Sequence, residues 1–291
     1  MIIDAHAHIL PQQRLNGLSI WLGKVFPKHP LAGQRFTEDS IMEDLYRNGV
    51  NYVFNYVFSM NENETKGLNL FNKELSEKFE NIIPFGCLHV KNKDKKSIVD
   101  LCIRDYGFLG FKLHPYVQGF SPDDERLFPA YERMEEYGAM VNIHTGFDEY
   151  YPKKIKSITL SMIEDIIKRF SSLMFILPHM FYPRLDESLY LLENYKNVTV
   201  DTTNVFSAII IDEKKGINMD HEREFILEVL NKWSNRMVFG TDHPAGMSSL
   251  DVIFKDFYSF NFKKNIISDL LFNTANNLIG GNPDSLKNKK R

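Results

Sequence analysis

Stretches typical of β-strands and stretches typical of α-helices alternate along the whole 291-residue chain. A short apolar run is followed by a longer amphipathic run, and this order repeats eight times. Parallel strands need such helical crossovers. In an open doubly wound sheet, the ligand binds where the order of the strands reverses, and the sequence shows no break that would mark such a reversal. We therefore predict an α/β fold, a single-domain (β/α)8 barrel (TIM barrel).

The boundaries follow from the apolar runs and from the glycines and prolines between them. A strand is predicted over residues 1–9, and seven more start at residues 50, 82, 107, 140, 172, 197 and 236. The helices between them are predicted over residues 37–48, 61–79, 95–106, 123–137, 158–170, 183–195 and 220–233. A loop insertion, residues 10–36, follows the first strand, and extra C-terminal helices cover 248–258 and 263–278. The barrel domain is expected over 1–281, with a frayed C-terminal tail over 282–291.

Composition narrows the class of protein. The net charge is −3, and no long block is dominated by one sign, so nucleic acid is not an expected partner. Cys87 and Cys102 are predicted to be reduced and buried, as in cytosolic proteins. The chain has no signal-peptide pattern and no run of the ~20 apolar residues that would span a bilayer, so we expect a soluble, cytoplasmic protein without a membrane partner.

Polar residues recur where the apolar runs end. His6 and His8 close the first strand two residues apart, and because a strand repeats every two residues, both imidazoles are predicted on one face. An isolated pair would more often be two ordinary strand histidines. Here further runs end in the same way, and catalytic groups in such barrels come from the carboxyl ends of the strands. The other strand-end residues are His114, His144, His179 and Asp242.

This set of side chains favours a metal site. Nitrogen ligands with one carboxylate suit Zn²⁺, with Mn²⁺, Fe²⁺ and Co²⁺ as alternatives. We therefore expect a divalent metal ion as the cofactor. A metal-bound water has its pKa lowered towards 7, and a nearby carboxylate can take its proton and pass it to a leaving group.

Several motifs resemble those of the amidohydrolase superfamily, in the branch of metal-dependent hydrolases related to aminocarboxymuconate-semialdehyde decarboxylase (amidohydrolase-2 type). They span nearly the whole chain in the family's order, and they favour the superfamily rather than any one reaction. The motifs are D-A-H-A-H, G-F-K-L-H-P-Y-V-Q-G-F-S-P-D-D-E-R-L-F-P, V-N-I-H-T-G, L-P-H, F-G-T-D-H-P and N-T-A-N-N-L-I.

The resemblance implies roles for individual residues. In mononuclear members, the residues that match His6, His8, His144 and Asp242 hold the metal, and the residue that matches His179 assists catalysis beside it. Asp242 and His179 are therefore the predicted catalytic residues: Asp242 as proton shuttle, and His179 as the group that polarises the substrate or the metal-bound water.

Lys112 leaves the number of metals open. In binuclear members a carboxylated lysine at this place bridges two ions, with the histidines that match His144 and His179 on the second ion. His114 lies nearer the rim than Lys112, and the string G-F-K-L-H-P resembles the mononuclear branch, so one metal is the preferred interpretation.

The predicted substrate-binding residues lie at the end of the fourth strand and in the segments that follow the fourth, fifth and sixth strands. Relatives often carry glycines after the sixth-strand histidine, where this chain has M-F-Y-P-R. Arg184 could pair with a carboxylate of the substrate, or it could be a solvated residue at the start of a helix. Four aromatic residues are expected to line the substrate entrance: Phe147, Tyr151, Phe181 and Tyr182. The substrate-binding set is Lys112, His114, Tyr116, Phe147, Phe181, Tyr182 and Arg184.

We predict a metal-dependent hydrolase that acts on a small carboxylated or cyclic amide or ester substrate through a metal-activated water. A non-oxidative decarboxylase (a lyase) of the same branch is the first alternative, since both reactions use the same ligands. A barrel that only binds a ligand is a weaker alternative. This chain keeps the full set of predicted metal ligands, and sites that have lost catalysis usually lose ligands first. The partner expected is a small-molecule substrate. The oligomeric state is open, with a homo-oligomer among the options.

Overall fold

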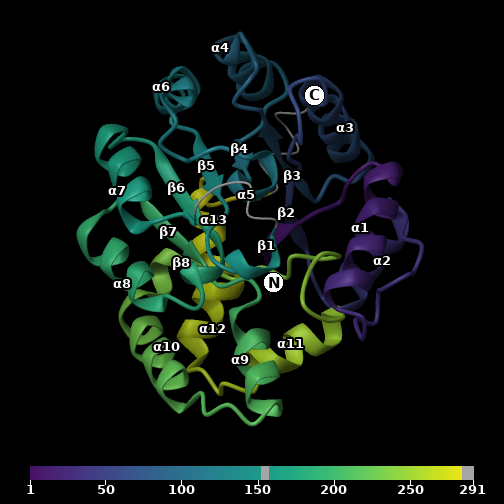
Figure 1. Ribbon diagram of the computed structural model, residues 1–291, viewed down its shortest axis with the longest axis vertical. Helices are drawn as coiled ribbons and strands as arrows, with labels where there is room; N and C mark the ends of the chain where they lie inside the picture. Colours follow the sequence, from purple (N-terminus) through teal and green to yellow (C-terminus); the bar gives the residue numbers. More distant parts are fainter. Residues whose placement is uncertain (152–156, 284–291) are drawn as a thin grey trace. The chain divides into compact units, whose positions relative to one another are not determined.

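The computed structural model describes residues 1–151 and 157–283. In this part of the chain, eight strands form one sheet in the order of the sequence (Figure 1). The pairs from β3 to β7 are all parallel. The predicted (β/α)8 barrel is therefore confirmed. The strands are β1 (Ile3–Ala7), β2 (Tyr52–Tyr56), β3 (Ile82–Cys87), β4 (Gly110–Leu113), β5 (Met140–Ile143), β6 (Met174–Leu177), β7 (Val198–Asp201) and β8 (Met237–Val238).

The helices that the sequence predicts are present. They are α2 (Glu38–Arg47), α3 (Thr65–Lys78), α4 (Lys95–Asp100), α6 (Phe128–Glu136), α7 (Leu160–Arg169), α8 (Leu185–Asn194), α10 (Asp220–Trp233), α11 (Leu250–Tyr258), α12 (Lys264–Ser268) and α13 (Thr274–Leu278). Two of the predicted stretches also contain a π-helical segment: Leu101–Asp105 continues α4, and Asp269–Asn273 joins α12 to α13. A short helix, α5 (Pro115–Gln118), follows β4.

Besides α5, two longer helices of the described residues are not predicted by the sequence. The insertion after β1 contains α1 (Gln12–Val25), which buries Leu15, Ser19 and Leu22 at helical spacing. Its glycines and the proline before it made this stretch look like a loop. The other is α9 (Val205–Lys214), whose first turns are buried on all sides. Such a run carries no amphipathic period by which it could be recognised.

Capping residues set the ends of the helices. Thr37 begins α2 with a capping box: its hydroxyl accepts from Ser40 N at 3.1 Å, and Ser40 Oγ accepts from Thr37 N at 2.9 Å. Gly49 follows the helix with φ +80°, a conformation that glycine adopts without steric cost. The next residues enter β2, as the glycine stop in the sequence predicts.

The chain divides into two compact units. Unit 1 comprises Met1–Phe54 and Asp201–Gly281. In unit 1, backbone hydrogen bonds tie β1 to the segment that follows β8: Ala5 N donates to Phe239 O at 2.9 Å, and His8 N donates to His243 O at 2.8 Å. The pairing between β1 and the last strand therefore continues past Val238, the last residue of β8, as far as His243.

Unit 2 comprises Asn55–Val200 and Asn282–Arg291, described as far as residue 283. Parallel pairing joins β3 to β4, β5, β6 and β7 in turn, and α3, α4, α6, α7 and α8 lie on the outer side of these strands in Figure 1. Phe85, Phe111 and Phe175 are completely buried among them. The carboxyl ends of these strands come to one edge, as parallel pairing requires.

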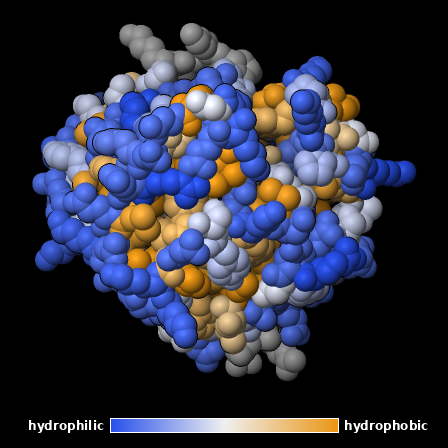
Figure 2. Space-filling view, turned by 90° about the horizontal axis from the view of Figure 1, so that it is seen from below, coloured by the Kyte–Doolittle hydropathy of each residue, from blue (hydrophilic) through white to orange (hydrophobic). Residues whose placement is uncertain are grey.

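Other expectations concern the tail and the surface. The predicted tail lies outside the described residues from 284 onwards. Among residues 1–151 and 157–283, no helix has the length and apolar character needed to cross a membrane. Hydrophilic residues cover most of the face shown in Figure 2, with hydrophobic residues visible between them. Location in the cytoplasm stays a prediction.

We predict that Gly110→Ala destabilises the protein. Gly110 lies in β4 opposite Met140, and a Cβ there would overlap with the backbone carbonyl of Met140, which cannot move without breaking the ladder. Overpacking of this kind costs about 1–3 kcal/mol in the free energy of unfolding, measurable by urea denaturation. The control is Gly67→Ala in α3, where a Cβ meets nothing within 4 Å and alanine is the better helix former. Equal effects of the two substitutions would contradict this explanation.

Candidate functional site

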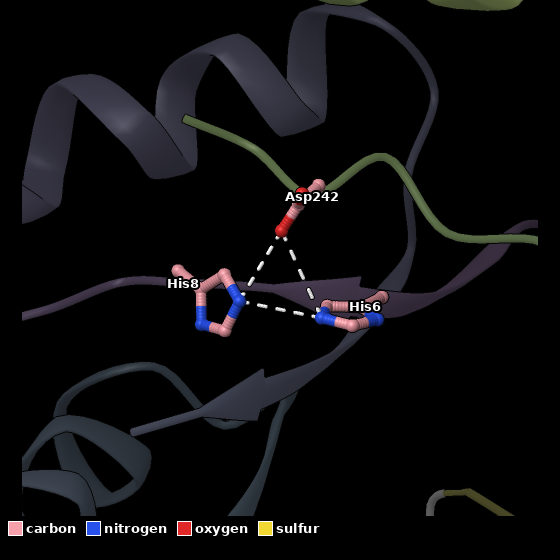
Figure 3. Close-up of side chains that lie close together, drawn as sticks. All are labelled: His6, His8 and Asp242. Carbon is pink, nitrogen blue, oxygen red and sulfur yellow. Dashed lines mark hydrogen bonds and ion pairs between the residues drawn. The ribbon is translucent and has the colours of Figure 1, made fainter. Parts of the chain in front are cut away.

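The metal-ligand cluster of unit 1 consists of His6, His8 and Asp242 (Figure 3). His6 lies within β1, His8 follows it, and Asp242 follows β8. The Nε2 atoms of His6 and His8 are 3.3 Å apart, and Asp242 Oδ1 lies 3.2 Å from His8 Nε2 and 3.7 Å from His6 Nε2. All three residues are buried. The prediction that His6 and His8 share a face is confirmed.

The cluster has the dimensions of a metal site. Ligand bonds of ~2.0–2.1 Å at tetrahedral angles place neighbouring donor atoms ~3.3–3.4 Å apart. The observed separations of 3.2, 3.3 and 3.7 Å surround that value. The donor atoms also belong to types that bind Zn²⁺ and Mn²⁺. These three residues therefore fit a divalent ion.

The backbone holds Asp242 in an uncommon conformation. Its φ is +60°, a left-handed value that non-glycine residues adopt at a cost in free energy. Its backbone N–H donates to His6 O at 2.7 Å, so the strained residue is fixed directly to β1. Residues in such conformations often occur at functional sites.

Two residues from the end of β7 contact the metal-ligand cluster. Asp201 Oδ2 lies 2.6 Å from His6 Nδ1, and Asn204 Nδ2 donates to Asp242 Oδ2 at 2.8 Å. Sequence reasoning missed both of them. The signal available was the polar string D-T-T-N directly after the apolar run of β7, but nothing in that string identifies the ligands as its partners.

Asp4 lies on the His6 face of β1, and its carboxylate is bonded to backbone groups. Asp4 Oδ1 accepts from the backbone N–H groups of His6 and Thr241 at 3.1 and 2.9 Å. Its other oxygen accepts from the Thr241 hydroxyl at 2.5 Å. Burial raises the pKa of Asp4 to about 7, although the hydrogen bonds from Thr241 act in the opposite direction.

In unit 2 the strand-end histidines form a second cluster. The rings of His114 and His144 stack with centroids 3.9 Å apart and planes 12° apart. His179 Nε2 lies 3.3 Å from His144 Nδ1. The structure thus brings together the predicted residues at the ends of β4, β5 and β6, as parallel pairing requires.

Aromatic rings surround this histidine cluster. Tyr151 meets His114 edge-on at 4.9 Å and His144 at 5.2 Å, and Phe147 meets His179 edge-on at 5.3 Å. Tyr182 lies 5.1 Å from Phe147, whereas Phe181 is completely buried. The rings of Phe147 and Tyr151 therefore contact the histidines. A role of all four aromatic residues in substrate binding stays a prediction.

A strained turn positions His179. His179, Met180 and Phe181 all have positive φ values, 66°, 49° and 55°. Gly146 lies against this turn, where a Cβ would be 2.9 Å from Tyr182 N, and Phe147 N donates to Tyr182 O at 2.9 Å. The loops after β5 and β6 therefore support each other, and the conformation of His179 depends on both.

Lys112 is completely buried in unit 2. Its ammonium donates to Asn142 Oδ1 at 2.7 Å and lies 5.3 Å from the centre of the Tyr56 ring. Both contacts suit a positive charge.

Arg184 and Tyr116 belong to a polar network in unit 2. Tyr116 donates to Asp148 Oδ1 at 2.5 Å, and burial, with this hydrogen bond, raises the pKa of Tyr116. Arg184 lies 3.4 Å from Asp148 Oδ2 and donates to Glu187 Oε1 at 2.9 Å. The guanidinium is thus occupied by carboxylates of the chain itself, and a substrate carboxylate would compete with them.

Comparisons with known proteins place these clusters in a family context. A family model described as Amidohydrolase matches residues 3–249. No curated protein was found to match the chain.

Three solved structures illustrate the likeness in fold. An uncharacterised TIM-barrel protein from Bordetella bronchiseptica is 18% identical, with a TM-score of 0.71, and the match covers 96% of this chain and 98% of that one. A putative 2-pyrone-4,6-dicarboxylic acid hydrolase from Pseudomonas putida is 14% identical, with a TM-score of 0.65 and coverage of 96% and 97%. A 5-carboxyvanillate decarboxylase from Novosphingobium aromaticivorans, with bound manganese, is 13% identical, with a TM-score of 0.65 and coverage of 96% of each chain.

We predict that the protein purified without chelator holds one divalent metal ion per chain, measured by elemental analysis. Replacing His6 and His8 together with alanine should remove the ion, because two of the three converging donor atoms are lost. The far-ultraviolet circular dichroism spectrum should not change, since the ligands lie at the strand end. Two ions per chain, or an ion retained by the double variant, would contradict the assignment.

Proposed function

Because the chain belongs to the amidohydrolase family, we propose that it is a metal-dependent hydrolase acting on a small carboxylated or cyclic amide or ester substrate. The observation that carries this proposal is the convergence of His6 Nε2, His8 Nε2 and Asp242 Oδ1. We further propose His144 as the fourth ligand, since its motif V-N-I-H-T-G stands in the family's order. Zn²⁺ is our first choice of metal and Mn²⁺ the second.

The chemistry then divides between the ion and the chain. A bound divalent ion would act as a Lewis acid and lower the pKa of a coordinated water. Asp242 would accept the proton of that water and return it to the leaving group, and Asn204 holds the Asp242 carboxylate in place through its hydrogen bond to Oδ2. His179 would polarise the substrate carbonyl or the attacking water.

The surroundings of Lys112 support a single metal. Carboxylation would replace the ammonium by an anionic carbamate, which keeps one N–H donor but loses the positive charge that suits both Asn142 Oδ1 and the negative face of the Tyr56 ring. A bridging carbamate is therefore disfavoured by these contacts. An unmodified Lys112 could instead contribute its charge to binding a substrate carboxylate.

Decarboxylation is the second candidate. The stacked rings of His114 and His144, with Tyr151 against their edges, suit a planar, unsaturated acid. One of the similar structures is a decarboxylase with manganese and another is a putative hydrolase of a pyrone dicarboxylic acid. Both reactions would use the same ligands.

The two reactions are separated by their products. Metal-loaded protein would be given 2-pyrone-4,6-dicarboxylate and 5-carboxyvanillate in parallel, with proton release and carbon dioxide both measured. The proposal expects ring opening of the pyrone, with proton release and no carbon dioxide. Release of carbon dioxide would contradict the proposed hydrolase activity and support the lyase activity. The double variant of His6 and His8 is the metal-free control.

We predict that His179→Asn lowers turnover by about 10²- to 10⁴-fold, the usual contribution of a general acid or base. The metal content, measured by elemental analysis, should stay at the wild-type value, because His179 is not among the proposed ligands. The matched control is His221→Asn on the exposed surface of α10, which should change neither quantity. Loss of metal in proportion to activity would make His179 a ligand, and the division of roles between the ends of β5 and β6 would then be wrong.

A further inference from the structure

We propose that two residues of the turn after β7, Asp201 and Asn204, position the ligands of the metal-ligand cluster. In this turn Asp201 fixes the ring of His6, and Asn204 fixes the carboxylate of Asp242. The inference rests on the metal site of the proposed function. It adds an explanation of why His6 presents Nε2, and Asp242 presents Oδ1, to the proposed ion. All of these residues belong to unit 1.

The contact between His6 and Asp201 determines the tautomer of the histidine. Both residues have no exposed surface, and Asp201 Oδ2 lies 2.6 Å from His6 Nδ1. An ionised carboxylate can only accept, so Nδ1 carries the hydrogen and Nε2 carries the lone pair. Nε2 is the ring atom that faces His8 Nε2 and Asp242 Oδ1. Asp201 therefore directs the metal-binding nitrogen towards the cluster.

Thr203 holds Asp201 in this arrangement. Its backbone N–H donates to Asp201 Oδ1 at 2.8 Å, and its hydroxyl donates to the same oxygen. Gly240 packs against this contact so closely that a Cβ would overlap with Thr203 Oγ1 and His6 Cβ. The backbone at Gly240 thus leaves no room for Thr203 Oγ1 or His6 Cβ to move towards it.

Asn204 acts on Asp242 in a comparable way. Met247 N donates to Asn204 Oδ1 at 3.2 Å, which orients the amide so that Nδ2 donates to Asp242 Oδ2 at 2.8 Å. Asp242 then presents Oδ1 to the histidines, 3.2 Å from His8 Nε2. Asn204 has φ +67°, a conformation that asparagine tolerates better than most residues.

The test uses a substitution that reverses one hydrogen-bond role. In Asp201→Asn, the Thr203 donors require the amide oxygen on their side, so the NH2 group would face His6 Nδ1. His6 must then accept at Nδ1 and carry its hydrogen on Nε2, the wrong tautomer for the proposed ligand. Loss of partners that orient a ligand weakens metal binding by about 10- to 100-fold. We expect a rise of that size in the dissociation constant for Zn²⁺ or Mn²⁺, measured by calorimetry on metal-stripped protein.

A second readout reports the tautomer itself. Long-range ¹H–¹⁵N spectra of histidine-labelled apo protein should show the His6 hydrogen on Nδ1 in the wild type and on Nε2 in Asp201→Asn. If Asp201→Asn does not fold, Asn204→Gly serves in its place, because glycine keeps the positive φ and removes the amide. It should also weaken metal binding. An unchanged dissociation constant in the folded variant would overturn the inference.

Thr202→Val is the matched control. Thr202 lies in the same turn, is equally buried and donates its hydroxyl to Val238 O at 3.1 Å rather than to a ligand. Its substitution should leave the dissociation constant for the metal unchanged. Equal weakening by Thr202→Val and Asp201→Asn would assign the effect to general damage of the turn and overturn the inference. A wild-type protein that binds neither ion would instead refute the proposed function.

Discussion

The backbone hydrogen bonds between the end of β1 and the segment after β8 are the interaction on which the metal-ligand cluster depends. Asp242 N donates to His6 O at 2.7 Å, and His8 N donates to His243 O at 2.8 Å. These two bonds bring residues from opposite ends of the barrel segment to donor-atom distances of 3.2–3.7 Å. Parallel strands end at one edge, so a ligand set can be assembled there from short motifs that are far apart in the sequence.

Backbone strain is concentrated at the same strand ends. His179, Asn204 and Asp242 follow β6, β7 and β8, and each has a φ between +60° and +67°. A non-glycine residue in this region costs of the order of 1–3 kcal/mol, so the surrounding contacts must impose it. Such contacts are present in each case: Asp242 is bonded to β1, Asn204 to Met247, and the His179 turn packs against Gly146. These contacts offset the cost in stability, and they fix the directions of three side chains of the candidate site.

The sequence predicted the features that follow from periodicity. Strand starts, most helix bounds and the polar residues at strand ends depend on local pattern, and they are present in the structure. Helix α9 was missed because residues 205–209 are buried on all sides, and α1 because its glycines resemble loop signals. Asp201 and Asn204 were missed for another reason: their partners are His6 and Asp242, and no spacing rule links positions so distant. Asp4, which shares the His6 face by simple alternation, instead bonds the Thr241 backbone.

The direction of hydrogen bonds explains how so few residues can specify the ligand atoms. A backbone N–H can only donate, so Thr203 N makes Asp201 Oδ1 an acceptor, and Met247 N does the same to Asn204 Oδ1. With Asp201 ionised, as we propose, these two donors leave one arrangement: Asp201 Oδ2 accepts from His6 Nδ1, and Asn204 Nδ2 donates to Asp242 Oδ2. His6 then presents Nε2 to the cluster, and Asp242 presents Oδ1. The atoms that these residues turn towards the cluster therefore follow from the path of the backbone after β7 and β8, and a substitution that keeps size but reverses a donor and an acceptor should be more damaging than its volume suggests.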